Sequence, residues 1–251
     1  MLYDQGEIMN YFENKVFWIT GANKGIGKAI AIRLINEFYK SKFILSSSSK
    51  ETIKNLINEI GMNKNVYFFP FDLRDKESID QTYDKIHNSI GEVDCLINNA
   101  GVGRFAPMLE LNEDDLDFTF DINFKAPFFL IKKVLPNMVK KKSGAIINIL
   151  SVVVRKSFPN SSIYSASKSA LLALTNSLRQ EVRKDGIKII NVMPGATETD
   201  IWHPRQREKY SSLMMQPDDV ADVIVSQIKL LSNERLHIEE IVIRPQNGDL
   251  S

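Results

Sequence analysis

The sequence predicts an α/β protein with a single doubly wound parallel sheet of about seven strands and helices on both faces. Short runs of β-branched and aromatic residues alternate with helical patterns, and helices of roughly ten to fifteen residues between strands are typical of parallel sheets with right-handed crossovers. A glycine-rich turn joins the first strand to the helix that follows it. No repeat or linker divides the 251 residues, so we expect one domain.

Composition excludes several classes of function. The net charge of +1 gives no reason to expect nucleic acid or an anionic membrane surface as a partner. No apolar run reaches the ~18–20 residues of a membrane span, and the first fourteen residues do not resemble a signal peptide. We therefore expect a cytoplasmic protein. Cys95, His87, His203 and His237 show no ligand spacing, so no metal site is expected.

The first strand, Lys15–Thr20, enters a glycine loop and then a helical pattern at Lys28–Phe38. This context predicts a dinucleotide site, because glycines let the backbone turn tightly towards a pyrophosphate at a helix N-terminus. A glycine-rich turn without a ligand is the alternative. The candidate cofactor-binding residues in the loop are Gly21, Lys24, Gly25, Ile26 and Gly27.

The second strand, Phe43–Leu45, ends in a run of four serines. A site for NAD usually carries an acid about 20 residues past the glycine loop, and here Ser47 stands at that position. The missing acid, the hydroxyls of Ser47 and Ser48, and the charge of Lys24 favour NADP(H). A solvated serine turn remains the alternative.

Polar or glycine-rich residues also follow the later strands. In such sheets ligands bind at the carboxyl ends of strands, so we expect these residues to share one edge. The strands expected are Val66–Phe71, Val93–Ile97, Gly144–Leu150, Lys188–Val192 and Glu239–Ile243. The first four end at Asp72-Leu73, Asn98–Gly101, Ser151 and Pro194–Thr199. Helices are expected at Lys50–Ile60, Lys76–Ile90, Asp114–Met138, Ser162–Lys184 and Pro217–Leu231.

Tyr164 and Lys168 lie four residues apart on a predicted helix, so they share one face. A cation beside the phenol favours the phenolate. Lowering a Tyr pKa from ~10 to about 7 takes roughly 4 kcal/mol, and a unit charge at ~4 Å supplies that at an effective dielectric of ~20. We therefore expect Lys168 to lower the pKa of Tyr164. Tyr11 and Lys15 have the same spacing, so the spacing alone does not identify a catalytic pair.

Two stretches depart from regular patterns. The segment Asp114–Met138 contains Pro127, which should kink the helix one turn after Asn123. The periodicity fades from Asp200 to Met215, around Trp202, within residues 196–215. They are expected to form a flap over the substrate pocket, or else a surface loop anchored by its aromatic side chains.

Taken together, Thr20–Gly27, Asn98–Gly101, Ser151, Tyr164 with Lys168, and Pro194–Thr199 resemble the short-chain dehydrogenase/reductase family. The resemblance spans Lys15 to Ile243, and the motifs stand in family order. It implies a Rossmann-like reductase domain at 15–251 after an N-terminal extension at 1–14.

The resemblance also implies roles for single residues. Tyr164 would be the general acid, Ser151 would hold the carbonyl oxygen, Lys168 would bind the nicotinamide ribose, and Asn123 would hold a water in a proton relay. The remaining cofactor contacts implied are Asp72 and Leu73 at the adenine, Asn99, Ala100 and Gly101 at the ribose side, and Pro194, Gly195, Thr197 and Thr199 at the nicotinamide side.

Within the family the chain resembles the bacterial sepiapterin reductases, through residues 98–105, 161–164, 213–217 and 239–250. This implies NADPH-dependent reduction of a ketone on a pterin side chain. Phe158 and Trp202 are candidate walls for the pterin and Asp249 a candidate anchor; ordinary packing and a solvated acid are the alternatives.

Other functions remain open from the sequence. A general short-chain carbonyl or 3-oxoacyl reductase would use the same catalytic residues. A non-catalytic, cofactor-sensing regulator is more remote, because such proteins typically lose the catalytic Tyr or Lys. The family also implies a homodimer or homotetramer formed through the two long helices. The stripe Ala166, Ala170, Leu174 and Leu178 fits such an interface, or else faces the sheet.

Overall fold

The sheet has seven parallel strands in the order β3-β2-β1-β4-β5-β6-β7. The computed structural model describes residues 5–61 and 63–250. The order reverses between β1 and β4, and such a reversal is where α/β sheets open a crevice for ligands. The strands are β1 Val16–Thr20, β2 Lys42–Ser47, β3 Val66–Pro70, β4 Cys95–Asn98, β5 Gly144–Ile149, β6 Ile187–Pro194 and β7 Glu240–Ile243.

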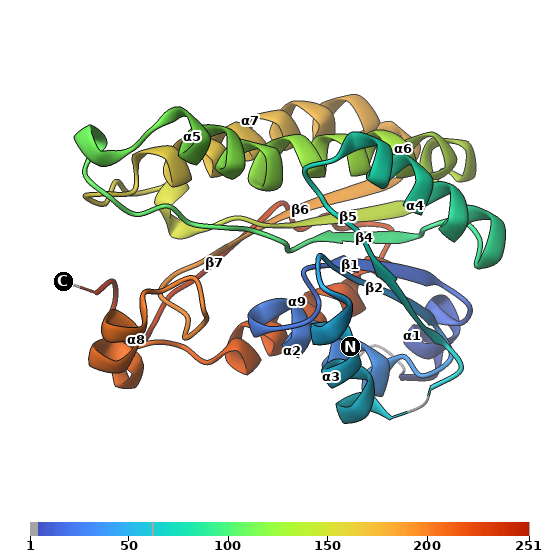
Figure 1. The fold of residues 1–251 in the computed structure, drawn as a ribbon. Coiled ribbons are helices and arrows are strands. Elements are labelled where there is room, and N and C mark those ends of the chain that lie inside the picture. Colours follow the sequence, from blue (N-terminus) through green and yellow to red (C-terminus); the bar gives the residue numbers. More distant parts are fainter. Residues whose placement is uncertain (1–4, 62, 251) are drawn as a thin grey trace.

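Helices cover both faces of the sheet (Figure 1), which confirms the predicted architecture. One face carries α4 Lys76–Ser89, α5 Glu113–Phe120, α6 Ala126–Lys141 and α7 Ser162–Val182. The other carries α1 Gln5–Phe12, α2 Gly25–Glu37, α3 Lys50–Ile60 and α9 Pro217–Lys229, and α8 Pro204–Tyr210 lies at one end.

Strand β1 shows how the sequence builds this sandwich. Its five residues are all buried, as expected for a central parallel strand covered on both faces. Phe17 and Ile19 pack with α2 and α9, whereas Val16 and Trp18 pack with α4 and α6. Alternate side chains therefore pack into two hydrophobic cores, one on each face of the sheet, because the side-chain period of a strand is two.

A ladder of buried asparagine amides crosses three strands in register. Asn98 donates to Asn148 at 2.9 Å, Asn148 donates to Asn191 at 3.0 Å, and Asn191 donates to Asn176 of α7 at 3.2 Å. Buried amides are hydrogen-bonded in stable proteins, so each of these bonds fixes the orientation of the next asparagine side chain. The ladder ties α7, which carries Tyr164 and Lys168, to the strands it covers.

The N-terminal residues form α1 and contact the core. The Phe12 ring is 2% exposed, and its centroid lies 4.3 Å from that of Phe38. Burying such a ring stabilises the fold by about 1.5–3 kcal/mol. The expected boundary between residues 14 and 15 stays a prediction, and residues 1–4 lie outside the described part.

The long helix expected at Asp114–Met138 is broken by a π-helical turn at Asp121–Lys125. There the Ala126 N–H donates to the carbonyl of Asp121, five residues back. The break lies next to Pro127, in the turn around Asn123, where the sequence predicts it. Lys125 and Ala126 keep right-handed helical angles, so Pro127 stands inside a continuous helix, where it cannot donate the usual hydrogen bond to the carbonyl four residues back. The π turn contains Asn123, and such turns are frequent at functional sites.

Residues 196–215 are also more ordered than the sequence predicts, because they contain α8. Pro204 occupies the first turn of α8, and the ring of His203 accepts a hydrogen bond from the Arg205 N–H. The two ends of the segment are tied together: Met215 N–H donates to Ala196 at 3.0 Å, and Glu198 N–H donates to Met215 at 2.8 Å. The segment is therefore a closed lobe at the carboxyl end of β6.

Candidate functional site

The loops after β1 and β4 are locked together at the reversal of the sheet. The Thr20 hydroxyl accepts hydrogen bonds from the N–H groups of Asn99 and Ala100, both at 3.1 Å. The Asn99 amide donates to the carbonyls of Thr20 and Gly21 at 2.9 and 3.1 Å. Asn99 thus holds the glycine loop in place.

The glycine loop is shaped for a close approach of backbone to a ligand. Gly21 and Gly25 have φ of +63° and +54°, a region that favours glycine. A Cβ on Gly27 would lie 2.2 Å from the Asn99 Nδ2 atom and 2.3 Å from the Gly21 oxygen. Only glycine fits there.

The N-terminus of α2 suits a pyrophosphate. Lys24 is its N-cap residue and makes no side-chain capping bond, and the first turn carries no acid. The first N–H groups of a helix need acceptors and carry partial positive charge. Among the described residues, the loop and this helix end therefore fit the phosphates of a dinucleotide.

The end of β2 carries no carboxylate. Ser46 is buried and accepts the Trp18 indole N–H at 2.9 Å, while the Ser47 hydroxyl donates to the Ser49 carbonyl at 3.0 Å. Ser48 is exposed. Lys24 forms an ion pair with Asp200 at 3.3 Å, so the expected cation is present but engaged.

The expected adenine acid, Asp72, stands beside Leu73 at the end of β3, and both are half-buried. Arg74 donates to both Asp72 oxygens at 2.7–3.1 Å. These hydrogen bonds hold the pKa of Asp72 below its usual range. The arginine therefore keeps the carboxylate charged and fixes its direction.

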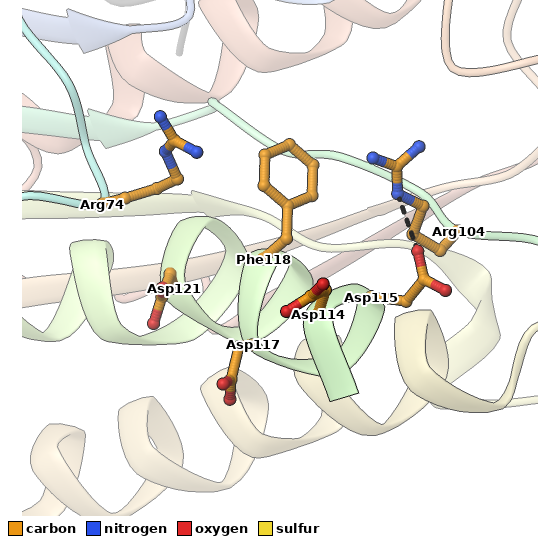
Figure 2. A pocket seen from close by; sticks show the side chains of 7 residues that line it. All are labelled: Arg74, Arg104, Asp114, Asp115, Asp117, Phe118 and Asp121. Carbon is orange, nitrogen blue, oxygen red and sulfur yellow. Dashed lines mark ion pairs between the residues drawn. The ribbon is translucent and has the colours of Figure 1, made fainter. Parts of the chain in front are cut away.

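The same arginine lines a surface hollow of about 480 Å³ on α5 (Figure 2). The guanidinium groups of Arg74 and Arg104 lie 5.7 and 4.9 Å from the centroid of the Phe118 ring, and the ring stands between them (Figure 2). The other residues around the hollow are Asp114, Asp115, Asp117 and Asp121. The hollow does not contain the Tyr164 cluster, which lies at the ends of β5 and α7.

Ser151, Tyr164, Lys168 and Asn123 come together at the carboxyl end of β5, where the sequence predicts Ser151; the other three reach it from α7 and the π turn. Tyr164 is 6% and Lys168 4% exposed, and the Ser151 side chain lies close enough to Tyr164 to influence the pKa of its hydroxyl. Lys168 Nζ donates to the Ile149 carbonyl at 2.8 Å and lies 6.0 Å from the centroid of the Tyr164 ring.

Asn123 supports this cluster from the π turn. Its amide donates to the Val102 carbonyl at 2.9 Å and to the Ser167 hydroxyl at 3.0 Å, and its oxygen accepts the Val102 N–H at 2.9 Å. A Cβ on Gly101 would lie 3.2 Å from Lys168 Nζ and 3.4 Å from Asn123 Oδ1. Gly101 therefore lies against both residues.

The expected lowering of the Tyr164 pKa is wrong for this structure. Burial raises the pKa of Tyr164 to about 12, and the nearby Ser151 side chain has the smaller, opposing effect. Burial also lowers the pKa of Lys168 to about 8. The effect of burial on the pKa of Tyr164 is therefore larger than any stabilisation of the phenolate by the lysine. Tyr164 consequently keeps its proton at neutral pH, as a proton donor must.

The end of β6 brings the remaining cofactor candidates to the same edge. Pro194 closes the strand, and the Gly195 N–H donates to Ile243 at 2.7 Å. Thr197 is buried, and its hydroxyl donates to the Gly195 carbonyl at 3.1 Å. A Cβ on Gly25 would lie 3.2 Å from the Thr199 methyl carbon, so Thr199 faces the glycine loop.

The three substrate candidates occupy different positions. The Trp202 indole donates to the Thr197 carbonyl at 3.0 Å. Phe158 lies under Lys156, whose Nζ is 5.3 Å from the ring centroid. The C-terminal tail folds back so that Asp249 pairs with Lys156 at 2.9 Å and with Arg244. Asp249 thus stands against the loop that follows Ser151, but two cations already bind it.

Phe105 is a site residue that sequence reasoning did not assign. Its ring is 45% exposed, and its centroid lies 5.3 Å from that of Tyr164 in an edge-to-face contact. A Cβ on Gly103 would lie 3.2 Å from Ile201, so this loop also approaches the lobe next to Trp202. An aromatic residue six positions after Asn99 was the available signal.

The second Tyr/Lys pair lies elsewhere. Lys15 stands 5.4 Å from the Tyr11 ring centroid and pairs with Asp94 at 3.6 Å, next to the amino ends of β1 and β4. Within residues 5–61 and 63–250, no group of three His, Cys, Asp or Glu residues is placed to hold a metal, and no helix is long and apolar enough to cross a membrane.

Comparison with known proteins agrees with this geometry. A family model described as short chain dehydrogenase matches residues 15–210. A sepiapterin reductase from Chlorobaculum tepidum is 34% identical, over 94% of this chain and 98% of its own. A metagenomic short-chain oxidoreductase solved with NADP has a TM-score of 0.79 and 28% identity, covering 94% of this chain and 98% of that one.

The fold is shared more widely. An alcohol dehydrogenase from the archaeon Thermococcus sibiricus, solved with 5-hydroxy-NADP, has a TM-score of 0.82 at 24% identity, covering 94% of this chain and 99% of that one. At that identity the likeness concerns the fold alone. The family model and the 34% identical relative cover most of this chain. The chain is therefore an oxidoreductase of the short-chain dehydrogenase/reductase family.

Proposed function

We propose that this protein is an NADP(H)-dependent carbonyl reductase, and that its substrate is a sepiapterin-like pterin with a ketone on its side chain. The observation that carries the proposal is the buried contact of Tyr164 with Ser151 beside Lys168, at the strand ends that face the glycine loop. The bound nicotinamide would supply the hydride.

The chain's own residues account for the rest of the reaction. Tyr164 holds a proton on its hydroxyl at neutral pH, because burial raises its pKa to about 12. It donates that proton to the carbonyl oxygen as the carbon is reduced. The Ser151 hydroxyl orients the same oxygen and stabilises its developing charge. Lys168, with a pKa of about 8, is mostly charged at neutral pH and favours the phenolate left behind.

The cofactor preference rests on the ends of β1 and β2. No acid stands where a ribose 2′-hydroxyl would need one, and Lys24 and Ser48 are exposed at that position. A 2′-phosphate would find a cation and hydroxyl donors there, and no carboxylate at the end of β2 would repel it. The relative solved with NADP supports this preference.

The pterin preference rests on the mouth of the site. Phe105 contacts Tyr164, and its loop approaches the lobe that carries Trp202; a flat heterocycle is bound well by such aromatic surfaces. The 34% identical sepiapterin reductase supports the same substrate class. Asp249 stands against the loop after Ser151 and would accept hydrogen bonds from an amino-pyrimidine edge.

One observation favours the general carbonyl reductase as a second candidate. The Asp249 carboxylate is already bound by Lys156 and Arg244, which reduces what it offers to a pterin. A site without that anchor would accept small ketones or acyl thioesters with little discrimination.

A substrate panel separates the two candidates. The purified protein is offered NADPH with sepiapterin, diacetyl or an acetoacetyl thioester, and NADPH consumption is followed by absorbance. We expect kcat/KM to be highest for sepiapterin, and a Tyr164→Phe variant serves as the background. Sepiapterin turnover no faster than that background would remove the pterin assignment.

We also propose that the protein is a homodimer or homotetramer. Ala166 on α7 is exposed, whereas the sheet-facing side of that helix buries other residues such as Leu171 and Thr175. Nearby, Met108 and Leu109 are 71% and 100% exposed. Large apolar side chains exposed to this extent are typical of interfaces. Light scattering on the purified chain measures the subunit count, and a monomeric mass would refute the proposal.

A further inference from the structure

The glycine loop and the lobe at 196–215 are joined by an ion pair that neither the catalytic cluster nor the packing of the core requires. Lys24 Nζ lies 3.3 Å from the Asp200 carboxylate. The contact is local and direct, because Thr199, the neighbour of Asp200, packs against Gly25, the neighbour of Lys24. The cation best placed for a 2′-phosphate therefore already has a carboxylate partner.

Asp200 has a second cation at hand. Arg207 of α8 donates to Asp200 at 2.6 Å and lies 3.4 Å from Glu198. If Lys24 leaves, Asp200 keeps a close partner on its own lobe. The side chains of Lys24 and Asp200 are 64% and 52% exposed, so water also solvates both groups during the exchange. The barrier to transferring Lys24 to another anion is therefore low.

We propose that Asp200 is a specificity-determining residue of the nucleotide site, which competes with the 2′-phosphate of the cofactor for Lys24. This inference rests on the proposed NADP(H) preference. The carboxylate lowers the affinity for a 2′-phosphate without affecting nucleotides that lack one. When the phosphate takes Lys24, Asp200 remains bound to Arg207.

The competition is measured with two ligands that carry no nicotinamide. Binding of 2′,5′-ADP and of 5′-AMP is followed by isothermal titration calorimetry at low ionic strength, where surface pairs are least screened. Four proteins form a double-mutant cycle: the wild type, Asp200→Asn, Lys24→Gln and the double variant. Glu208→Gln removes the same charge from the same lobe and is the control, because Glu208 is exposed and has no ion pair within the described part of the chain.

We expect Asp200→Asn to bind 2′,5′-ADP about two- to fivefold more tightly than the wild type, which is the range of an exposed ion pair. Its affinity for 5′-AMP should not change, and Glu208→Gln should behave as the wild type. In the Lys24→Gln background, Asp200→Asn should have no effect. The gain should also disappear at high salt.

Two results overturn the inference alone. One is an Asp200→Asn variant that binds 2′,5′-ADP no more tightly than the wild type. The other is an equal gain in the Lys24→Gln background, which would mean that Asp200 acts through the general field of the lobe. A wild type that binds 2′,5′-ADP no better than 5′-AMP would instead overturn the NADP(H) preference as well.

Discussion

Replacing Lys168 by methionine should stabilise the protein at neutral pH while it removes activity. Lys168 is 4% exposed, and burial lowers its pKa from 10.5 to about 8. At about 1.36 kcal/mol per pKa unit, keeping this charge buried costs about 3 kcal/mol below about pH 7. The substitution also leaves the Ile149 carbonyl without the lysine hydrogen bond, a loss of about 1–3 kcal/mol. We expect a net gain of up to about 2 kcal/mol at about pH 7.

The pH dependence identifies the cause. The unfolded chain binds the lysine proton up to about pH 10.5, whereas the folded protein releases it near pH 8. The unfolded state therefore holds more protons between these values, and wild-type stability rises with pH in that window. Below about pH 7 the penalty is fully present and constant. Relative to the Lys168→Met variant, the wild type should gain about 2 kcal/mol between about pH 7 and about pH 9.5.

Urea unfolding of both proteins at several pH values measures this difference. Lys132→Met, which removes an exposed lysine from α6, is the control and should stay within about 0.5 kcal/mol of the wild type at every pH. If the stability difference between the wild type and Lys168→Met does not change from about pH 7 to about pH 9.5, the burial argument fails.

Two further substitutions test the site. Tyr164→Phe should reduce kcat by about 10²–10⁴-fold, because it removes the proton donor. Its affinity for NADPH, measured by fluorescence, should stay close to that of the wild type. A variant with full turnover would instead favour the cofactor-sensing regulator. Gly27→Ala forces a methyl group to within 2.2 Å of Asn99. This substitution should lower the free energy of unfolding in urea by about 1–3 kcal/mol and weaken NADPH binding. An unchanged affinity for NADPH would show that the loop accommodates the methyl group without changing the binding site.

Most elements and the edge that bears the site were predictable, because they depend on local patterns. The five buried residues of β1 and the glycines after Thr20 identify the first unit. Strand-end residues converge for a topological reason: parallel strands present their carboxyl ends at one edge. That rule brings Ser151 to the same edge as the loop after β1, and Tyr164 joins it from the first turn of the helix that follows β5. The asparagine ladder was not predicted, because the register that aligns Asn98, Asn148 and Asn191 is set by the pairing of the strands.

Other features depend on contacts between residues distant in sequence. The π turn is stabilised by the bonds of Asn123 with Val102 and Ser167, and no periodicity reports them. The helix α8 lies in a stretch whose local pattern resembles a loop, and its closed base is built by Met215 and Ala196.

The sequence by itself determined which chemical groups follow which elements: a glycine loop after the first strand, no acid after the second, and a Ser, Tyr and Lys at the fifth strand and the helix that follows it. Only the tertiary structure decided how those groups behave. Burial, which depends on the whole fold, raises the pKa of Tyr164 where the spacing to Lys168 alone suggested the opposite. The tertiary structure likewise pairs Lys24 with Asp200 and Asp249 with Lys156, because folding sets which charges come within reach of each other.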